Sequence, residues 1–168
     1  MVVLDATAGN RHLWGKNSEN INTVFVDKEY GLKIPPNLFA DFTMLPFRSN
    51  IFECVIFDPP HYTSPPPWFD DPKENRMGRQ GPFYGIKWRK NKLIKSLHLA
   101  QEEFARVSDR LCFRWFEFSI TIWKILSIFT IENWKEIYRT RIKGPSNHKS
   151  DGCWWVTFIR KRESKTVG

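Results

Sequence analysis

The sequence predicts an α/β fold whose sheet is mostly parallel. Four short apolar runs are its first support, and each closes at or just before an aspartate: Val2–Leu4, Thr23–Val26, Leu38–Ala40 and Cys54–Phe57. Short, continuously apolar strands are typical of parallel sheets that are buried on both faces. In open sheets of this kind, ligands bind in the crevice outside the carboxyl ends of the strands.

A helical pattern follows the fourth run and is the second support for this fold class. Apolar residues recur at spacings of four, three, four and three, namely Leu93, Leu97, Ala100, Phe104 and Val107. These spacings place the apolar side chains on one face of an amphipathic helix. A strand followed by a helix is the expected beginning of a parallel crossover.

The C-terminal third predicts a fifth strand over Leu111–Phe116 and then an apolar segment over Ile120–Phe129. We interpret that segment as a buried helix, although its periodicity alone leaves a strand open. Glu136–Ile142 and Trp154–Arg160 indicate an antiparallel hairpin. The connections between the early strands are short. Only ten residues separate Asp27 from Leu38, so a full crossover helix does not fit there.

Composition limits the class of protein. The chain has 168 residues, 41% of them hydrophobic, and we expect a single domain over residues 1–168 with one core. The net charge of +8 favours a polyanionic partner, with nucleic acid ahead of an acidic membrane surface, and a soluble basic protein without such a partner is the alternative. Aromatic residues make up 15% of the chain, and rings among basic residues are suited to stacking on bases.

The cysteines and the N-terminus indicate a location inside the cell. Cys54, Cys112 and Cys153 fit neither a zinc pattern nor a disulfide framework, so we expect reduced thiols and no metal. The N-terminus lacks the pattern of a secretory signal. The run from Ile120 to Ile131 is too short to span a bilayer. We therefore expect an intracellular, cytoplasmic protein with no membrane partner.

Three motifs at the ends of the first three strands could hold a ligand. The turn Leu4–Asn10 contains Gly9, which can take positive φ and let a ligand approach the backbone. It has one glycine where a dinucleotide fingerprint needs three, so a plain turn stays open. Asp27 stands 22 residues after Asp5, where an acid can accept hydrogen bonds from ribose, or simply cap a turn. Asp41 and Phe42 could bind and cover an adenine, or form a turn beside the core.

The fourth strand ends in Asp58-Pro59-Pro60-His61. An exocyclic aromatic amine is a poor nucleophile, because its lone pair is delocalised into the ring. If Asp58 and the Pro59 carbonyl each accept one N–H, they stabilise the positive charge that builds as a methyl arrives. The prolines stiffen the backbone, and His61 or Tyr62 can stack on the base. A strand-ending turn with a surface acid is the alternative.

A basic, aromatic segment over residues 63–90 leaves directly from this strand end. We interpret it as a long loop that binds one strand of nucleic acid with a base pulled out. A solvated charged loop is the alternative. With Tyr62 before it, the residues that we expect to bind substrate are Arg76, Arg79, Tyr84, Trp88, Arg89 and Lys90.

Together these motifs resemble the class I S-adenosylmethionine-dependent methyltransferases. The order and spacing of Asp5–Asn10, Asp27, Asp41-Phe42 and Asp58–His61 are similar to that family over about residues 1–160. The fourth motif looks like that of the amino-methyltransferases, which carry Asp-Pro-Pro-Tyr and methylate exocyclic nitrogens of bases. Two departures are Arg11-His12 in the first motif and His61 where Tyr or Phe is usual.

The resemblance implies a Rossmann-like, seven-strand sheet with a C-terminal antiparallel hairpin and some shortened crossover helices. It implies that Asp5, Ala6 and Gly9 cradle the methionine part of S-adenosylmethionine, that Asp27 binds its ribose, and that Asp41 and Phe42 bind its adenine. Asp58, Pro59, Pro60 and His61 become the catalytic motif.

The activity implied is methyl transfer to N6 of adenine in DNA or RNA. Transfer to N4 of cytosine or to a protein amide is an alternative, and so is a nucleic-acid-binding protein that keeps the fold without transfer.

Overall fold

The four N-terminal apolar runs form neighbouring parallel strands. The computed structural model describes residues 2–15, 22–61, 90–117, 120–143 and 152–161. The strands from these runs are β1 (Val3–Asp5), β2 (Thr23–Asp27), β3 (Leu38–Phe39) and β4 (Cys54–Phe57). All are paired in parallel, β2 with β3 and β1 with both β2 and β4. β1 and β2 end on their aspartates, whereas Asp41 and Asp58 follow β3 and β4.

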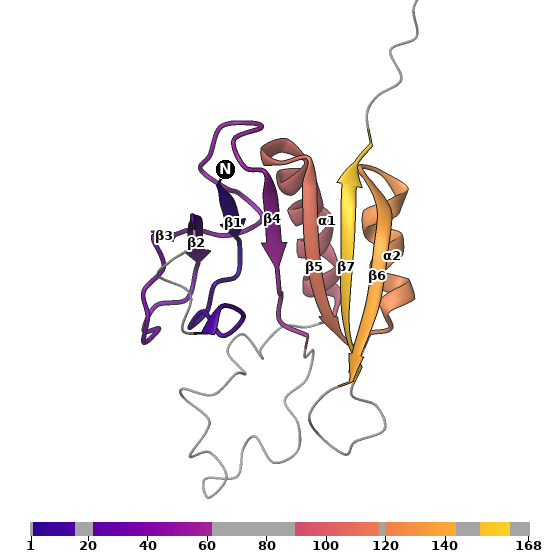
Figure 1. Ribbon diagram of the computed structural model, residues 1–168, viewed down its shortest axis with the longest axis horizontal. Helices are drawn as coiled ribbons and strands as arrows, with labels where there is room; N and C mark the ends of the chain where they lie inside the picture. Colours follow the sequence, from indigo (N-terminus) through magenta and orange to yellow (C-terminus); the bar gives the residue numbers. More distant parts are fainter. Residues whose placement is uncertain (1, 16–21, 62–89, 118–119, 144–151, 162–168) are drawn as a thin grey trace, which may run out of the picture.

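The C-terminal strands complete a seven-stranded sheet with the order β3-β2-β1-β4-β5-β7-β6 (Figure 1). They are β5 (Arg110–Phe116), β6 (Trp134–Lys143) and β7 (Gly152–Arg160). β5 is parallel to β4, while β7 runs antiparallel to both β5 and β6. The predicted fold class, a Rossmann-like and mostly parallel sheet with an antiparallel hairpin at its C-terminal end, is confirmed.

Two helices are described, α1 (Lys90–Val107) and α2 (Ile122–Ile131). α1 is the helix that the apolar spacing predicts. The segment Ile120–Phe129 is helical from Ile122 onwards, where it forms most of α2. The Thr121 side chain makes no capping bond at the start of α2. Instead, the Ile122 amide donates to the Glu117 carboxylate at 2.8 Å, which satisfies one of the free N–H groups of the first turn.

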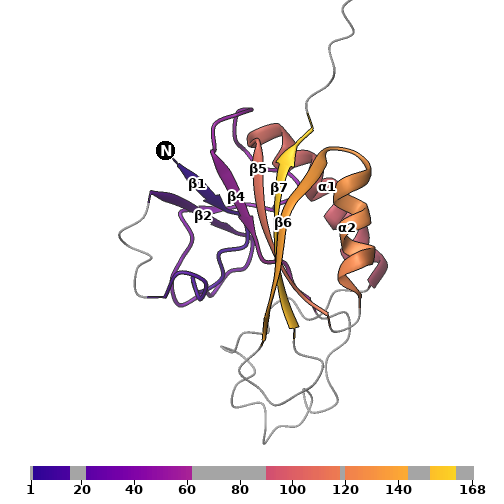
Figure 2. The same cartoon turned by 45° about the vertical axis from the view of Figure 1, so that its right-hand side comes forward.

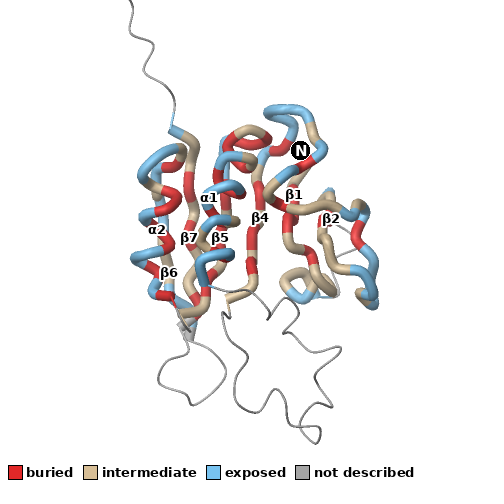
Figure 3. The backbone as a smooth tube through the Cα atoms, turned by 180° about the vertical axis from the view of Figure 1, so that it is seen from behind, coloured by how far each residue is buried: buried red, intermediate tan, exposed pale blue. Residues whose placement is uncertain are grey.

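Both helices pack on the same face of the sheet, as the turned view shows (Figure 2). Phe57 of β4 contacts Phe104 of α1 with ring centroids 4.7 Å apart. Phe113 of β5 contacts Phe129 of α2 at 5.0 Å. The core therefore lies between the helices and this face, where the buried residues concentrate (Figure 3).

The connection from β3 to β4 contains no helix, in agreement with the prediction of trimmed crossovers. Side chains of α1 hold it in place. The Leu45 amide donates to Glu103 at 2.7 Å, and Arg106 donates to the Phe47 and Leu45 carbonyls at 2.6 and 2.9 Å. The described helices include none that is both long and apolar enough to cross a membrane.

Candidate active site

Hydrogen bonds join the carboxyl ends of β1, β2 and β4 into one unit. The Gly9 amide donates to Asp27 at 2.8 Å, with Gly9 at φ 50°. The Asp58 amide donates to the Thr7 hydroxyl at 2.8 Å. The turn after β1 is therefore tied to the strand on either side of it, because parallel strand ends meet at the same edge of the sheet.

Asp5 is the most buried acid of this edge, with 1% of its surface exposed. Its carboxylate accepts hydrogen bonds from the Thr7 amide at 3.1 Å and from the Trp14 indole at 2.7 Å. Burial raises the pKa of Asp5 to about 6, against the lowering effect of these two hydrogen bonds, and the charges of Asp58 and Asp27 raise it further. The turn is therefore built around a carboxyl group whose pKa is raised, by its burial, well above the usual value for an aspartate.

The pKa of Asp5 predicts a pH effect on stability. A carboxyl whose pKa is higher in the folded chain binds more protons there than in the unfolded chain, so its contribution to stability falls as pH rises from about 4 to about 6. A shift of two pKa units corresponds to about 3 kcal/mol. The variant Asp5→Asn cannot titrate, so its stability relative to wild type should rise by about that amount between pH 4 and pH 7. Urea unfolding across this range tests the prediction, which parallel curves for the two proteins would contradict.

Asp27 uses both carboxylate oxygens to hold backbone amides. Oδ2 accepts from Gly9 at 2.8 Å and Oδ1 accepts from Glu29 at 2.9 Å. Each carboxylate oxygen has two lone pairs, so each can still accept one more hydrogen bond. Asp27 therefore shapes the turn after β1 while keeping the capacity to receive ribose hydroxyls.

Asp41 and Phe42 lie in the turn after β3. Asp41 accepts two hydrogen bonds from Thr43, at 2.9 and 2.8 Å, and one from Lys28 at 3.3 Å. Burial alone would raise the pKa of Asp41, but these partners hold it below its usual value. Phe42 is 4% exposed and packs against Phe57 with centroids 5.0 Å apart, so its ring belongs to the core as well as to this edge.

Asp58 is held on both sides at the end of β4. Arg114 of β5 donates to Oδ2 at 2.7 Å, and His61 Nε2 lies 2.8 Å from Oδ1. Only 17% of the Asp58 side chain is exposed. Burial would raise its pKa, but His61 and Arg114 outweigh that effect and keep the pKa of Asp58 below its usual value. Asp58 is therefore a fixed, ionised carboxylate.

The two partners of Asp58 are themselves held by aromatic rings. The Phe116 amide donates to His61 Nδ1 at 3.5 Å, which leaves Nε2 as the nitrogen that carries a proton towards Asp58. The His61 ring packs edgewise on Trp115 and Phe116, with centroids 5.1 Å away in both cases. The Arg114 guanidinium lies 4.7 Å from the Phe116 ring and donates to Cys153 at 3.2 Å. A role for His61 in stacking on a base stays a prediction, and its contact with Asp58 is an additional role.

The structure brings together Asp5, Ala6, Gly9, Asp27 and Asp58 at one edge of the sheet. Pro59 is buried there and Pro60 is half-buried. Sequence reasoning missed Arg114, Thr7 and Trp14. For Arg114 a signal was present, since an arginine between Phe113 and Trp115 in a central apolar strand needs a partner.

Most of the expected substrate-binding residues lie outside the part of the chain that the structure describes. Tyr62, Arg76, Arg79, Tyr84, Trp88 and Arg89 lie outside the described residues. Lys90 is the first residue of α1 and is exposed. The contribution of this loop to binding stays a prediction.

Known structures with the same fold include several methyltransferases. A SAM-dependent methyltransferase from Methanosarcina mazei is 10% identical, with 95% of this chain and 92% of that chain covered and a TM-score of 0.58. The N-methyltransferase NodS from Bradyrhizobium japonicum, in complex with S-adenosyl-L-homocysteine, is 11% identical over 96% and 77% of the two chains, with a TM-score of 0.54.

A third similar structure is a protein from Pyrococcus horikoshii that is described as a proposed RNA methyltransferase. It is 13% identical over 96% of this chain and 75% of that chain, with a TM-score of 0.52. No protein-family profile and no functionally curated protein matches the sequence. The likeness therefore shows that the chain has the SAM-dependent methyltransferase fold.

Proposed function

We propose that this protein transfers a methyl group from S-adenosylmethionine to an exocyclic amine of a nucleic-acid base, N6 of adenine in DNA or RNA. The observation that supports this best is Asp58. It is an ionised, rigidly held carboxylate at the end of β4, joined through Thr7 to the turn that we expect to hold the cofactor. NodS, a protein of the same fold, is itself an N-methyltransferase.

The residues at the ends of β1 to β3 fit the cofactor. Ala6, Ala8 and Gly9 carry little or no side chain, and at the half-buried Gly9 the methionine part would be able to approach the backbone of the turn after β1. Asp27 would accept the ribose hydroxyls, and Asp41 the amine of the cofactor adenine. Phe42 would contribute the edge of its ring beside that adenine. Bound S-adenosylmethionine supplies a methyl group on a sulfonium, already activated for displacement.

Asp58 and Pro59 would prepare the acceptor amine. Arg114 occupies one position on Oδ2 of Asp58, and that oxygen keeps one lone pair that can accept an N–H, whereas Oδ1 is buried against His61. With the Pro59 carbonyl accepting the second N–H, the nitrogen lone pair would be directed away from these two acceptors and towards the bound methyl donor. The cofactor would supply the methyl group, and the amine proton would leave to solvent after transfer. Orientation and charge stabilisation supply the catalysis.

Loss of Asp27 should weaken cofactor binding. A hydrogen bond to a charged acceptor contributes about 1.5–3 kcal/mol, so Asp27→Ala should reduce affinity for S-adenosylmethionine at least tenfold in calorimetry. Asp109→Ala is a suitable control, since Asp109 is an exposed acid that precedes β5 and pairs with Arg160. If wild type bound no cofactor at millimolar concentration, the cofactor assignment would be wrong.

Transfer itself is tested with methyl-labelled cofactor. The protein is incubated with separate pools of single-stranded DNA, duplex DNA and RNA, and the label bound to each pool is counted. We expect label in at least one pool and none with heat-inactivated protein. Label on added protein alone would favour an amide acceptor, and oligonucleotide binding without any transfer would favour a binding protein on this fold.

A further inference from the structure

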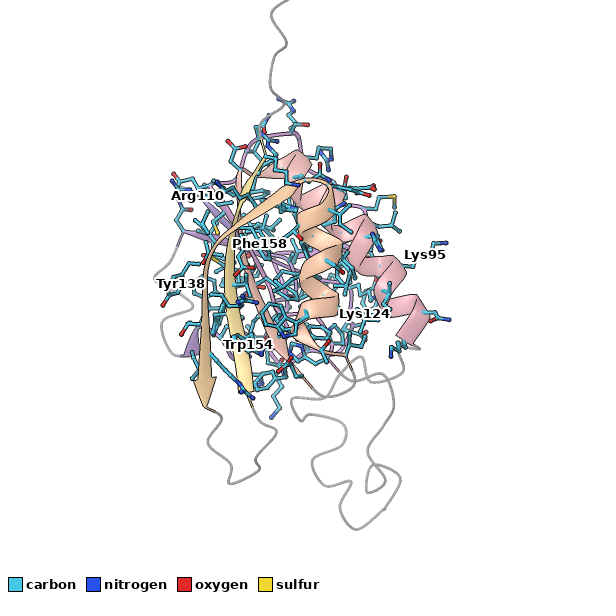
Figure 4. The ribbon with its side chains drawn as sticks, turned by 90° about the vertical axis from the view of Figure 1, so that its right-hand side faces the viewer. Lys95, Arg110, Lys124, Tyr138, Trp154 and Phe158 are labelled. Carbon is cyan, nitrogen blue, oxygen red and sulfur yellow. The ribbon has the colours of Figure 1, made fainter. Side chains whose placement is uncertain are left out.

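The half of the sheet formed by β5, β7 and β6 has one face that no described helix covers. Figure 4 shows the sheet nearly edge-on, with α1 and α2 on one side. Arg110 and Tyr138 point to the opposite side from Lys95 and Lys124, which lie on the helices. In β5 the buried residues Leu111, Phe113 and Trp115 alternate with residues that face this second side, as the period of a strand requires.

The strand pairing arranges the residues of this open face in rows. From the amino edge of β5 towards its carboxyl edge, the rows are Lys135, Ile159 and Arg110; Tyr138, Thr157 and Cys112; Thr140, Trp155 and Arg114; and Ile142, Cys153 and Phe116. Successive rows are two residues apart, so four rows extend for about 20 Å. We call these twelve residues the open face.

The open face is basic and partly aromatic. Among its residues are Arg110, Arg114 and Lys135, and none is acidic. Arg110 and Lys135 are exposed, and neither side chain has an ion-pair partner within the described part of the chain. Tyr138 is 61% exposed. Two exposed cations without ion-pair partners and an exposed aromatic ring on an uncovered sheet together form a surface suited to a polyanion with flat rings.

The position of the open face relates it to the candidate active site. Its last row ends at Phe116, whose amide donates to His61, and its third row contains Arg114, which donates to Asp58. A strand of nucleic acid that lies along the rows therefore approaches the carboxylate that we propose acts on the base. Stacking on Tyr138 and phosphate contacts from Arg110 and Lys135 need no particular sequence.

We propose that the open face binds a single-stranded stretch of DNA or RNA that leads to the base that reacts. This inference rests on the proposed function, and it assigns binding to described residues outside the loop at 63–90. The charge of the face complements phosphate, and its rings complement unstacked bases, which a duplex or a lipid headgroup does not offer.

The test compares two charge reversals of equal size in the full chain. Arg110→Glu with Lys135→Glu changes the open face, and Lys95→Glu with Lys124→Glu changes the helix face. The probe is a fluorescein-labelled 12-nucleotide single strand, as DNA and as RNA. The open-face variant should weaken binding at least tenfold more than the helix-face variant. Its log–log salt slope should become shallower by about 1.4, for two lost contacts at about 0.7 each.

An aromatic pair of variants separates stacking from charge. Tyr138→Ala should weaken binding several-fold with an unchanged salt slope, because stacking releases no counterions. Trp123→Ala, at an exposed ring on α2, should leave binding unchanged. Thermal unfolding of each variant confirms that the fold is retained.

The outcomes distinguish this proposal from the proposed function. Equal effects of the two charge reversals, or absence of binding by wild type, would overturn the open face as a nucleic-acid surface. The proposal would also be overturned if the open-face variant lost binding to vesicles of anionic phospholipid but kept its binding to the single strand. Methyl transfer is measured on the same variants. If the two charge-reversal variants bind the single strand equally well and still transfer methyl, only the open face is rejected. Binding through the open face without any transfer rejects only the enzyme.

Discussion

Replacing Asp58 with alanine should reduce single-turnover methyl transfer by about a hundredfold or more, the usual effect of removing one preorganised polar group. The carboxylate is held by Arg114 at 2.7 Å and by His61 at 2.8 Å, so it needs no reorganisation when charge develops on the amine. Affinity for S-adenosylmethionine should stay within a few-fold of wild type, because the expected cofactor contacts lie at the ends of β1 to β3.

Asp58→Asn is the matched control for this experiment. Asparagine keeps one oxygen acceptor but has no charge, so its rate should fall between those of the alanine variant and wild type. Single-turnover transfer from labelled cofactor gives the rate, and calorimetry gives the cofactor affinity. An alanine variant that transfers methyl at nearly the wild-type rate would exclude Asp58 from the mechanism.

Replacing Arg114 with alanine should change the pH dependence of transfer and lower stability. The variant leaves a mostly buried carboxylate with His61 as its remaining partner, which should cost about 2 kcal/mol of unfolding free energy at pH 7. In wild type the pKa of Asp58 is lowered, so its stabilising pair with Arg114 is present at neutral pH and is lost as pH falls through that pKa. Without Arg114 the pKa of Asp58 rises, so the acid limb of transfer should move to higher pH.

Arg114→Lys distinguishes positioning from charge alone. Lysine restores a cation, so the acid limb should return towards wild type. It lacks the planar group that stacks on Phe116 while donating to Asp58, so the maximal rate should recover only in part. Transfer measured from pH 5 to pH 9 tests both variants. A wild-type acid limb in the alanine variant would show that Arg114 does not set the ionisation of Asp58.

The sequence predicted the fold well wherever local patterns are sufficient. β4 has the predicted bounds, while β1 ends on Asp5 and β6 begins at Trp134, each a shift of one or two residues. α2 could not be told from a strand by periodicity, because most of its residues are apolar and its exposed side chains include Trp123 and Ile131. The packing of Phe129 against Phe113 and Phe158 fixes one face of the helix on the sheet.

The sequence predicted where the acids of the candidate site lie, but not which side chains they contact. Asp5, Asp27 and Asp58 could be placed at one edge, because parallel strands order their carboxyl ends together. The pair of Asp58 with Arg114 joins residues 56 positions apart, and no local pattern encodes it. The inward direction of Phe42 likewise depends on Phe57 across the sheet.

Identification of the methylated atom tests the central claim most directly. Wild type is allowed one turnover on a mixed-sequence single strand with deuterated-methyl cofactor, and the digested nucleosides are separated by mass spectrometry against standards. We predict that the label appears on N6 of adenine and is absent with Asp58→Ala. Label on a ring nitrogen, on a carbon or on ribose would contradict the account, because none of those positions offers the two N–H groups that Asp58 and the Pro59 carbonyl are proposed to accept.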